Sequence, residues 1–297
     1  MKTSRSIRLT SLNRNSSLAA LLACLLIFSC SAMAGRTIPL SVINMDGIHA
    51  ADDGIIYATE GFNGSRVFGI TQEGITFVLA SGLAGPIDVA NDSSGNLYVS
   101  NFNDATVTKI SPDGSSVEKF ADVLPGPAGI VIDANDNVYV SHYGEGNGDG
   151  DTVLKITPDG MVSVFAEGDF LLAPVATAID EHGNIYVANF NQGAVIKISP
   201  EGSQELLATV DAPNGFAIGH MAYANERLYA SGTAAQTIYV IRMNGKVRER
   251  SRRVDEARFP NGLTYNDVDN SILFTYGFGR VSDIEKIQLR PTVQLQQ

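Results

Sequence analysis

The 297-residue sequence contains no tryptophan and only two cysteines, Cys24 and Cys30, which both lie near its start. The lack of tryptophan removes the side chain that most often stacks on sugar rings. The lack of cysteine after Cys30 excludes disulfides, thiolate metal sites and cysteine nucleophiles from the rest of the chain. Basic residues are also outnumbered, since the formal net charge is -11. Such a charge repels nucleic acid and anionic lipid, so we expect no nucleic-acid partner.

The N-terminal segment has the pattern of a secretory signal peptide. An apolar run at residues 18–28 follows four basic residues and ends at Ala32-Met33-Ala34. We therefore expect residues 1–34 to be a signal peptide and residues 35–297 to be exported, either to the periplasm or as a secreted protein. The alternative is a lipoprotein attached through Cys30, because residues 27–30 loosely resemble a lipoprotein cleavage box. No later segment approaches the roughly 20 apolar residues of a membrane span, so we expect none.

The remainder of the chain repeats itself. Gly-Asn-Leu-Tyr-Val-Ser-Asn-Phe-Asn at residues 95–103 returns almost unchanged at residues 183–191, and both copies continue into Val-x-Lys-Ile-Ser-Pro-(Asp/Glu)-Gly. Aligned copies place six residues at one position of the repeat, between 41 and 47 residues apart: Tyr57, Tyr98, Tyr139, Tyr186, Tyr229 and Leu273. A period near 40 with several short strands in each unit is typical of propeller blades.

Turn residues divide each unit into four short strands. In the third unit they fall at residues 129–132, 138–141, 153–157 and 161–166. The sequence therefore predicts an all-β fold, a six-bladed β-propeller of four-stranded antiparallel blades. The sixth unit reaches only a third strand, and an additional strand at residues 37–43 precedes the first unit. We expect this N-terminal strand to complete the last blade and close the ring, which would remove an exposed sheet edge.

These motifs resemble the NHL-repeat propellers over essentially the whole chain after residue 34. Phe-Pro-Asn-Gly-Leu at residues 259–263 is similar to a segment of the senescence-marker/gluconolactonase-like superfamily. The resemblance implies that Asn261 is a ligand of a divalent metal in the central channel, and that Asp46 occupies the place of a glutamate ligand. The third ligand of that family, an aspartate after proline, is missing, because the chain has Pro86-Ile87, Pro127-Ala128 and Pro174-Val175.

Residues that interrupt the repeat are the other candidates for a site. We call the same place in successive repeats a column. Asp88 replaces the glycine or alanine of its column. In the next column His220 replaces Ile, Val, Thr or Leu. Glu60 and His142 occupy a third column, in which blades two and four have Asn101 and Asn189. Oxygen ligands suit calcium or magnesium, so we expect any metal to bind Asp46, Asn261, Asp88 or Glu60. His142 and His220 are the candidate general bases. The alternative is structural, with turn caps and core histidines.

Two charged segments complete the candidates. Residues 145–151 alternate glycine with oxygen-bearing side chains and resemble the start of a calcium loop, but no bidentate glutamate follows at the required distance, so a flexible acidic loop is the alternative. Residues 246–253 form the only basic run, in which Lys246, Arg248, Arg250 and Arg252 alternate along a predicted outer strand. This run discourages edge pairing, and an anionic partner is the second hypothesis for it.

Two functions are compatible with these features. The first is an exported propeller that binds a protein or a small ligand on its loop-bearing face without chemistry of its own. The second is a metal-dependent lactonase or ester hydrolase, in which a cation polarises the carbonyl or activates water. The missing second carboxylate ligand favours binding over catalysis. Propellers support both, so the fold alone does not decide between them.

Overall fold

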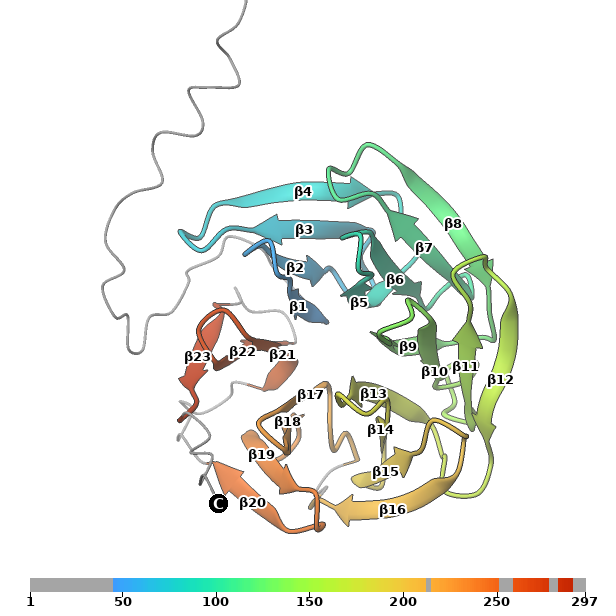
Figure 1. The fold of residues 1–297 in the computed structure, drawn as a ribbon, viewed down its shortest axis with the longest axis vertical. Helices are drawn as coiled ribbons and strands as arrows, with labels where there is room; N and C mark the ends of the chain where they lie inside the picture. The colour runs from blue at the N-terminus through green and yellow to red at the C-terminus, as the bar shows by residue number, and fades with distance from the viewer. Residues whose placement is uncertain (1–44, 212–214, 251–258, 278–282, 291–297) are drawn as a thin grey trace, which may run out of the picture. The chain divides into compact units, whose positions relative to one another are not determined.

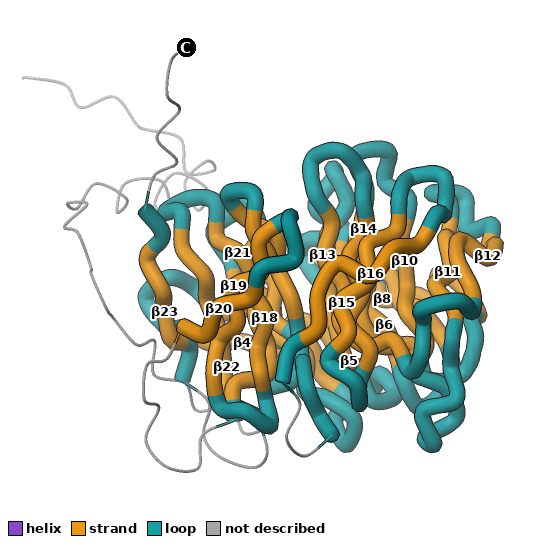
Figure 2. The backbone as a smooth tube through the Cα atoms, turned by 90° about the horizontal axis from the view of Figure 1, so that it is seen from below, coloured by secondary structure: helices purple, strands orange, loops and turns teal. Residues whose placement is uncertain are grey.

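The computed structural model describes residues 45–211, 215–250, 259–277 and 283–290. Within these residues the chain forms six antiparallel sheets, five with four strands and one with three, arranged around a ring (Figure 1). Figure 2 shows strands and loops but no helix in the described part. The described residues therefore include no helix that is long and apolar enough to cross a membrane. The predicted six-bladed all-β propeller is confirmed.

The blades follow one another in chain order, and each runs from an inner to an outer strand. Sequential neighbours are hydrogen-bonded, as expected for up-and-down blades. The strands of blades one to three are β1 (Ile48–Ala50), β2 (Ile56–Thr59), β3 (Arg66–Ile70), β4 (Thr76–Ser81), β5 (Pro86–Asn91), β6 (Leu97–Asn101), β7 (Thr106–Ile110), β8 (Val117–Asp122), β9 (Pro127–Ile132), β10 (Val138–His142), β11 (Thr152–Ile156) and β12 (Val162–Glu167).

The remaining strands form blades four to six. They are β13 (Pro174–Ile179), β14 (Ile185–Asn189), β15 (Ala194–Ile198), β16 (Gln204–Thr209), β17 (Met221–Ala224), β18 (Arg227–Gly232), β19 (Thr237–Arg242), β20 (Val247–Arg250), β21 (Pro260–Asn266), β22 (Ser271–Tyr276) and β23 (Glu285–Gln288). Inner strand β21 of blade six contacts β1 of blade one, so the ring of inner strands is closed. The predicted closing strand at residues 37–43 and the predicted signal peptide lie outside the described residues.

The Gly-Asn-x-Tyr motif has a structural explanation in the turn between the first two strands of a blade. In blade two, Asp92 accepts hydrogen bonds from the Asn96 amide and from the Tyr98 hydroxyl, at 2.8 and 3.1 Å. Lys109 on the neighbouring strand lies over the Tyr98 ring. Blade three repeats the arrangement, since Asp133 accepts from Asn137 and Tyr139. The motif therefore fixes the turn and has no catalytic meaning.

Hydroxyl groups on the second strands join neighbouring blades at their inner ends. Each hydroxyl donates to a carbonyl oxygen at the start of the next blade's inner strand, and it accepts a backbone N–H at the start of its own. The donor–acceptor pairs are Thr59–Ile87, Ser100–Ala128, Ser141–Val175 and Ser231–Asn261, at 2.6 to 3.0 Å. We call these contacts the hydroxyl bridges. They fix where each inner strand begins, and so they position the side chains at that end of the ring.

The glycines of the inner strands allow this close approach between blades. A Cβ at Gly129 would lie 2.3 Å from the Val175 carbonyl oxygen of the next blade, and a Cβ at Gly262 would lie 2.3 Å from the Asp46 carbonyl oxygen. Both distances are far below van der Waals contact. Glycine in the Pro-x-Gly motif is therefore required by the space between inner strands.

Candidate functional site

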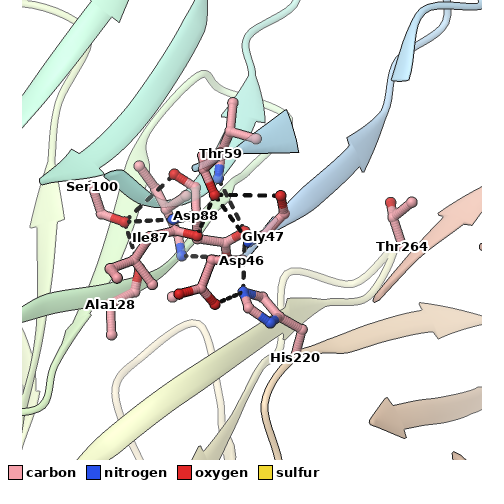
Figure 3. Close-up of polar contacts among 12 residues, drawn as sticks. Asp46, Gly47, Thr59, Ile87, Asp88, Ser100, Ala128, His220 and Thr264 are labelled. Atoms are coloured by element: carbon pink, nitrogen blue, oxygen red, sulfur yellow. Dashed lines mark hydrogen bonds and ion pairs between the residues drawn. The ribbon is translucent and has the colours of Figure 1, made fainter. Parts of the chain in front are cut away.

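Four of the six predicted site residues come together at the start of the inner strands. Asp46 precedes β1, Asp88 is in β5, His220 immediately precedes β17, and Asn261 is in β21. They belong to blades five, six, one and two, which follow one another around the ring (Figure 1). Figure 3 shows the His220 ring directed at the Asp46 and Asp88 carboxylates.

His220 is the centre of this cluster. Its Nε2 atom lies 3.8 Å from Asp88 Oδ1 and 4.0 Å from Asp46 Oδ1. The Asn261 amide nitrogen donates a 2.9 Å hydrogen bond to Asp46 Oδ1. The side chains of His220 and Asp88 are 6% and 10% exposed, whereas that of Asp46 is 25% exposed. The cluster is thus mostly removed from water and opens at Asp46.

Backbone groups hold the cluster in place. Asp88 accepts hydrogen bonds from its neighbour's N–H, at Val89, and from the Ile130 N–H of blade three, at 3.0 and 3.1 Å. The His220 N–H donates to the Ser231 hydroxyl of a hydroxyl bridge at 2.8 Å. The two N–H groups restrict the rotation of the Asp88 carboxylate, and the Ser231 hydroxyl fixes the backbone from which the His220 ring projects.

Burial dominates the electrostatics of the two carboxylates. It raises the pKa of Asp46 above the usual value, while the nearby His220 ring and the Asn261 hydrogen bond act in the opposite direction. Burial also raises the pKa of Asp88, against the effects of His220 and of backbone hydrogen bonds from Ile130 and Val89. Carboxyl groups with a raised pKa next to an imidazole are candidates for proton transfer.

The cluster's hydrogen bonds use some of the groups that a calcium or magnesium ion would need, although the Asn261 Oδ1 atom has no hydrogen-bond partner among the described residues. Asn261 directs its amide nitrogen, a donor, at Asp46, and both Asp88 oxygens already accept backbone N–H groups. Among the described residues there is no group of three or more His, Cys, Asp or Glu side chains that could hold a metal ion. The imidazole of His220 lies beside the two carboxylates that would share a cation. Metal binding by Asp46, Asn261, Asp88 or Glu60 stays a prediction, which is tested below.

Glu60 and His142 lie apart from the cluster. Glu60 forms an ion pair with Arg66 and accepts the Ser65 N–H at 2.9 Å, in the loop between β2 and β3. His142, at the end of β10, is 1% exposed, and its ring nitrogens have no hydrogen-bond partner in the described structure. The column of Glu60 and His142 lies at the same end of the ring as the cluster, because the end of each second strand pairs with the start of its inner strand, as His142 does with Pro127. The Glu60 side chain is directed at Arg66, and the His142 ring is enclosed within blade three. The structure therefore assigns neither of them a contact with His220.

His142 should make the protein less stable in acid. Burial lowers the pKa of His142 from 6.5 to about 4. The unfolded chain binds a proton near pH 6.5, which the folded protein does not bind until about pH 4, so stability falls as the pH drops through this range. At pH 5 the loss is about 2 kcal/mol. His142→Asn, the residue of the same column in blades two and four, should remove this loss in denaturant titrations at pH 7 and pH 5. An unchanged difference between variant and parent at the two pH values would contradict the assignment.

An arc of five aromatic rings surrounds the same end of the ring and was not predicted. Successive ring centroids are 5.3, 6.0, 5.1 and 4.6 Å apart. The N–H groups of the second, third and fourth members donate to carbonyl oxygens immediately before β5, β9 and β13, which places the arc where the inner strands begin. Its members, in order, are Phe62, Phe102, Tyr143, Phe190 and Phe216. We call them the aromatic arc.

The sequence contains a pattern from which part of the aromatic arc could have been predicted. Its middle members follow the Asn, His and Asn of the second strands, so an aromatic residue recurs at one position of blades two, three and four. Phe62 is 51% exposed and the other four are half-buried, so the arc is partly open to solvent.

Solved structures with this fold include enzymes and binding proteins. A gluconolactonase from Xanthomonas campestris is 16% identical, with a TM-score of 0.68 over 85% of this chain and 89% of that one. A calcium-binding regucalcin from Agrobacterium tumefaciens is 12% identical, with a TM-score of 0.69 over 86% and 95%. A virginiamycin B lyase from Staphylococcus aureus, crystallised with quinupristin, is 14% identical, with a TM-score of 0.64 over 86% and 99%.

The likeness is one of fold. It places this propeller among structural neighbours of the gluconolactonase-like class, as the motifs of residues 95–103 and 259–263 predicted. No family model matches the sequence, and no curated protein matches it. At these identities, the function has to be argued from the cluster itself.

Proposed function

We propose that this propeller hydrolyses a small cyclic ester, a lactone, at the cluster of Asp46, Asp88, His220 and Asn261. The observation that carries the proposal is that His220 Nε2 lies within 4.0 Å of two carboxylates, of which Asp88 is buried and Asp46 is partly buried. Removing acids from water costs stability, so a purely structural role explains the arrangement poorly. An imidazole held between carboxylates is suited to act first as a base and then as an acid.

The reaction uses the chain's own groups. His220 Nε2 removes a proton from a water molecule as its oxygen bonds to the lactone carbonyl carbon. Asp46 and Asp88 stabilise the resulting imidazolium by charge. The ring C–O bond then breaks, and the imidazolium returns the proton to the departing alkoxide, which leaves a hydroxy acid. Asn261 positions Asp46 through the 2.9 Å hydrogen bond. The aromatic arc would bind the apolar part of the substrate.

Binding without turnover is the second candidate, favoured by the aromatic arc. An arc with the half-exposed Phe62 at its end can bind a small ligand even if no bond is broken. In that case the acidic cluster recognises hydrogen-bond donors or a positive charge on the ligand. This is the function that the sequence alone favoured.

Proton release from a series of γ- and δ-lactones tests both candidates. The chain beginning at Gly35 should show saturable turnover that persists after EDTA treatment. Saturable binding without proton release would favour the second candidate. If there is neither binding nor proton release, both candidates are overturned. Calcium and magnesium form a separate comparison. If either ion raises the melting temperature and turnover depends on it, and the double variant Asp46→Ala/Asn261→Ala loses both effects, the site is metal-dependent.

A further inference from the structure

Five arginines line one groove between blades five and six, although the protein as a whole is strongly acidic. The groove has a volume of about 390 Å³. Figures 1 and 2 both place β20 of blade five next to β23 of blade six, where the groove lies. The arginines are Arg227, Arg242, Arg248, Arg250 and Arg290. We call this feature the arginine groove.

Strand register explains how four of these arginines share one face. Arg227 of β18 is directly opposite Arg242 of β19. On the next strand pair, Val240 is opposite Arg248 and Ile238 is opposite Arg250. Side chains directly opposite each other, or two residues apart on one strand, project from the same face of a sheet. This face packs against blade six, because Ile238 and Tyr229 belong to the same hydrophobic cluster as Leu263 and Ile287.

The other blades show that this charge is specific to blade five. In blade four, Lys197 of β15 is opposite Glu205 and pairs with it at 3.2 Å. The corresponding pair in blade five is Val240 and Arg248, so the outer position has changed from an acid to a base. Blades two, three and four also have an aspartate, such as Asp92, that accepts from the turn asparagine and the tyrosine. At that place blade five has Ala224.

No carboxylate neutralises the arginine groove within the part of the chain that the structure describes. No ion pair joins any of its five arginines to an acid there. Glu249 also borders the groove, but it is opposite Tyr239 and so projects from the other face of β20. Like charges directly opposite each other, as in Arg227 and Arg242, destabilise a sheet. An anion between them would remove this cost.

We propose that the arginine groove is a binding site for a small oligoanion that carries two or more phosphate or sulfate groups. The guanidinium group forms paired hydrogen bonds with such oxyanions. Several anionic groups are needed, because four of the arginines come from three strands of blade five and the fifth, Arg290, follows β23 of blade six. A ligand can reach these guanidinium groups, because four of the five arginines are exposed. This site is independent of the cluster around His220.

Calorimetric titration with tripolyphosphate, and separately with a heparin-derived tetrasaccharide, tests the site and distinguishes phosphate from sulfate. We expect saturable binding of at least one probe that weakens with added salt. Arg227→Gln/Arg242→Gln should weaken it on the order of tenfold or more. The matched control is Lys109→Gln/Lys155→Gln, which removes two positive charges that lie over tyrosines of blades two and three. The control should retain the parent affinity.

The same variants give a second measurement that does not depend on choosing the right probe. Without any anion, Arg227→Gln should raise the melting temperature, because it removes the like-charge pair. The proposal is overturned if neither probe binds, or if the control weakens binding as much as the arginine variant. It is also overturned if Arg227→Gln lowers the melting temperature, which would mean that the arginines are neutralised within the protein.

Discussion

Replacing His220 by glutamine should reduce kcat/KM for lactone hydrolysis by at least about 100-fold, the usual contribution of a general base. Glutamine keeps a polar side chain of similar length but cannot carry a proton between water and the leaving oxygen. The melting temperature should change little, because the contact between residue 220 and Ser231 is made through the backbone N–H. Initial rates together with a thermal melt would separate the catalytic effect from a folding defect.

His182→Gln is the matched control. His182 lies in an exposed turn beside Glu181, away from the cluster, so its replacement should leave kcat/KM unchanged. A variant at His220 with parental kcat/KM would show that the imidazole is not the base.

Gly129→Ala should be among the most destabilising single substitutions in the ring. The added Cβ would lie 2.3 Å from the Val175 carbonyl oxygen and 2.8 Å from the Thr177 N–H nitrogen, both backbone atoms of the next blade. These atoms can yield only if the inner strands of blades three and four move apart, which would also stretch the Ser141–Val175 hydroxyl bridge. We expect a loss of about 3 kcal/mol, which lowers the melting temperature on the order of 10 °C.

Blade four offers the control for this substitution. Ala176 occupies the glycine column there and is fully buried, so the same position tolerates a Cβ where the neighbouring blade leaves room. Ala176→Gly should cost only about 1 kcal/mol, through backbone entropy and a lost methyl group. If Gly129→Ala and Ala176→Gly proved equally mild in denaturant titrations, contact between inner strands would not explain the glycine column.

The repeat was sufficient to predict the fold because one blade's hydrogen-bonding and packing pattern recurs in the others. The strands predicted at residues 138–141 and 153–157 differ from β10 and β11 by one residue at their ends. Turn residues made this accuracy attainable, since Asp133 and Asn137 fix the start of the second strand through side-chain hydrogen bonds. The closing strand at residues 37–43 remains a prediction.

The site could be predicted in part for a similar reason. Columns of the repeat converge at one end of the ring, so Asp88 and His220, which break their columns, were found together with Asp46 and Asn261. The same reasoning selected Glu60 and His142, but a column does not show which way a side chain is directed after the strand ends. Glu60 turned toward Arg66 instead. The arginine groove depends on strand register and on contact between blades, neither of which can be read from the repeat.

The hydroxyl bridges have a mechanical consequence for the ring. They connect blade one to two, two to three, three to four, and five to six. Between blades four and five the hydroxyl is replaced by Ala188, and between blades six and one the Thr275 hydroxyl has no partner among the described residues. The hydroxyl bridges thus divide the blades into two groups, one to four and five to six. Asp46 and Asp88 belong to the first group and His220 and Asn261 to the second, so the Asn261–Asp46 hydrogen bond joins the groups where a hydroxyl bridge is missing. A molecule bound at the cluster would contact both groups.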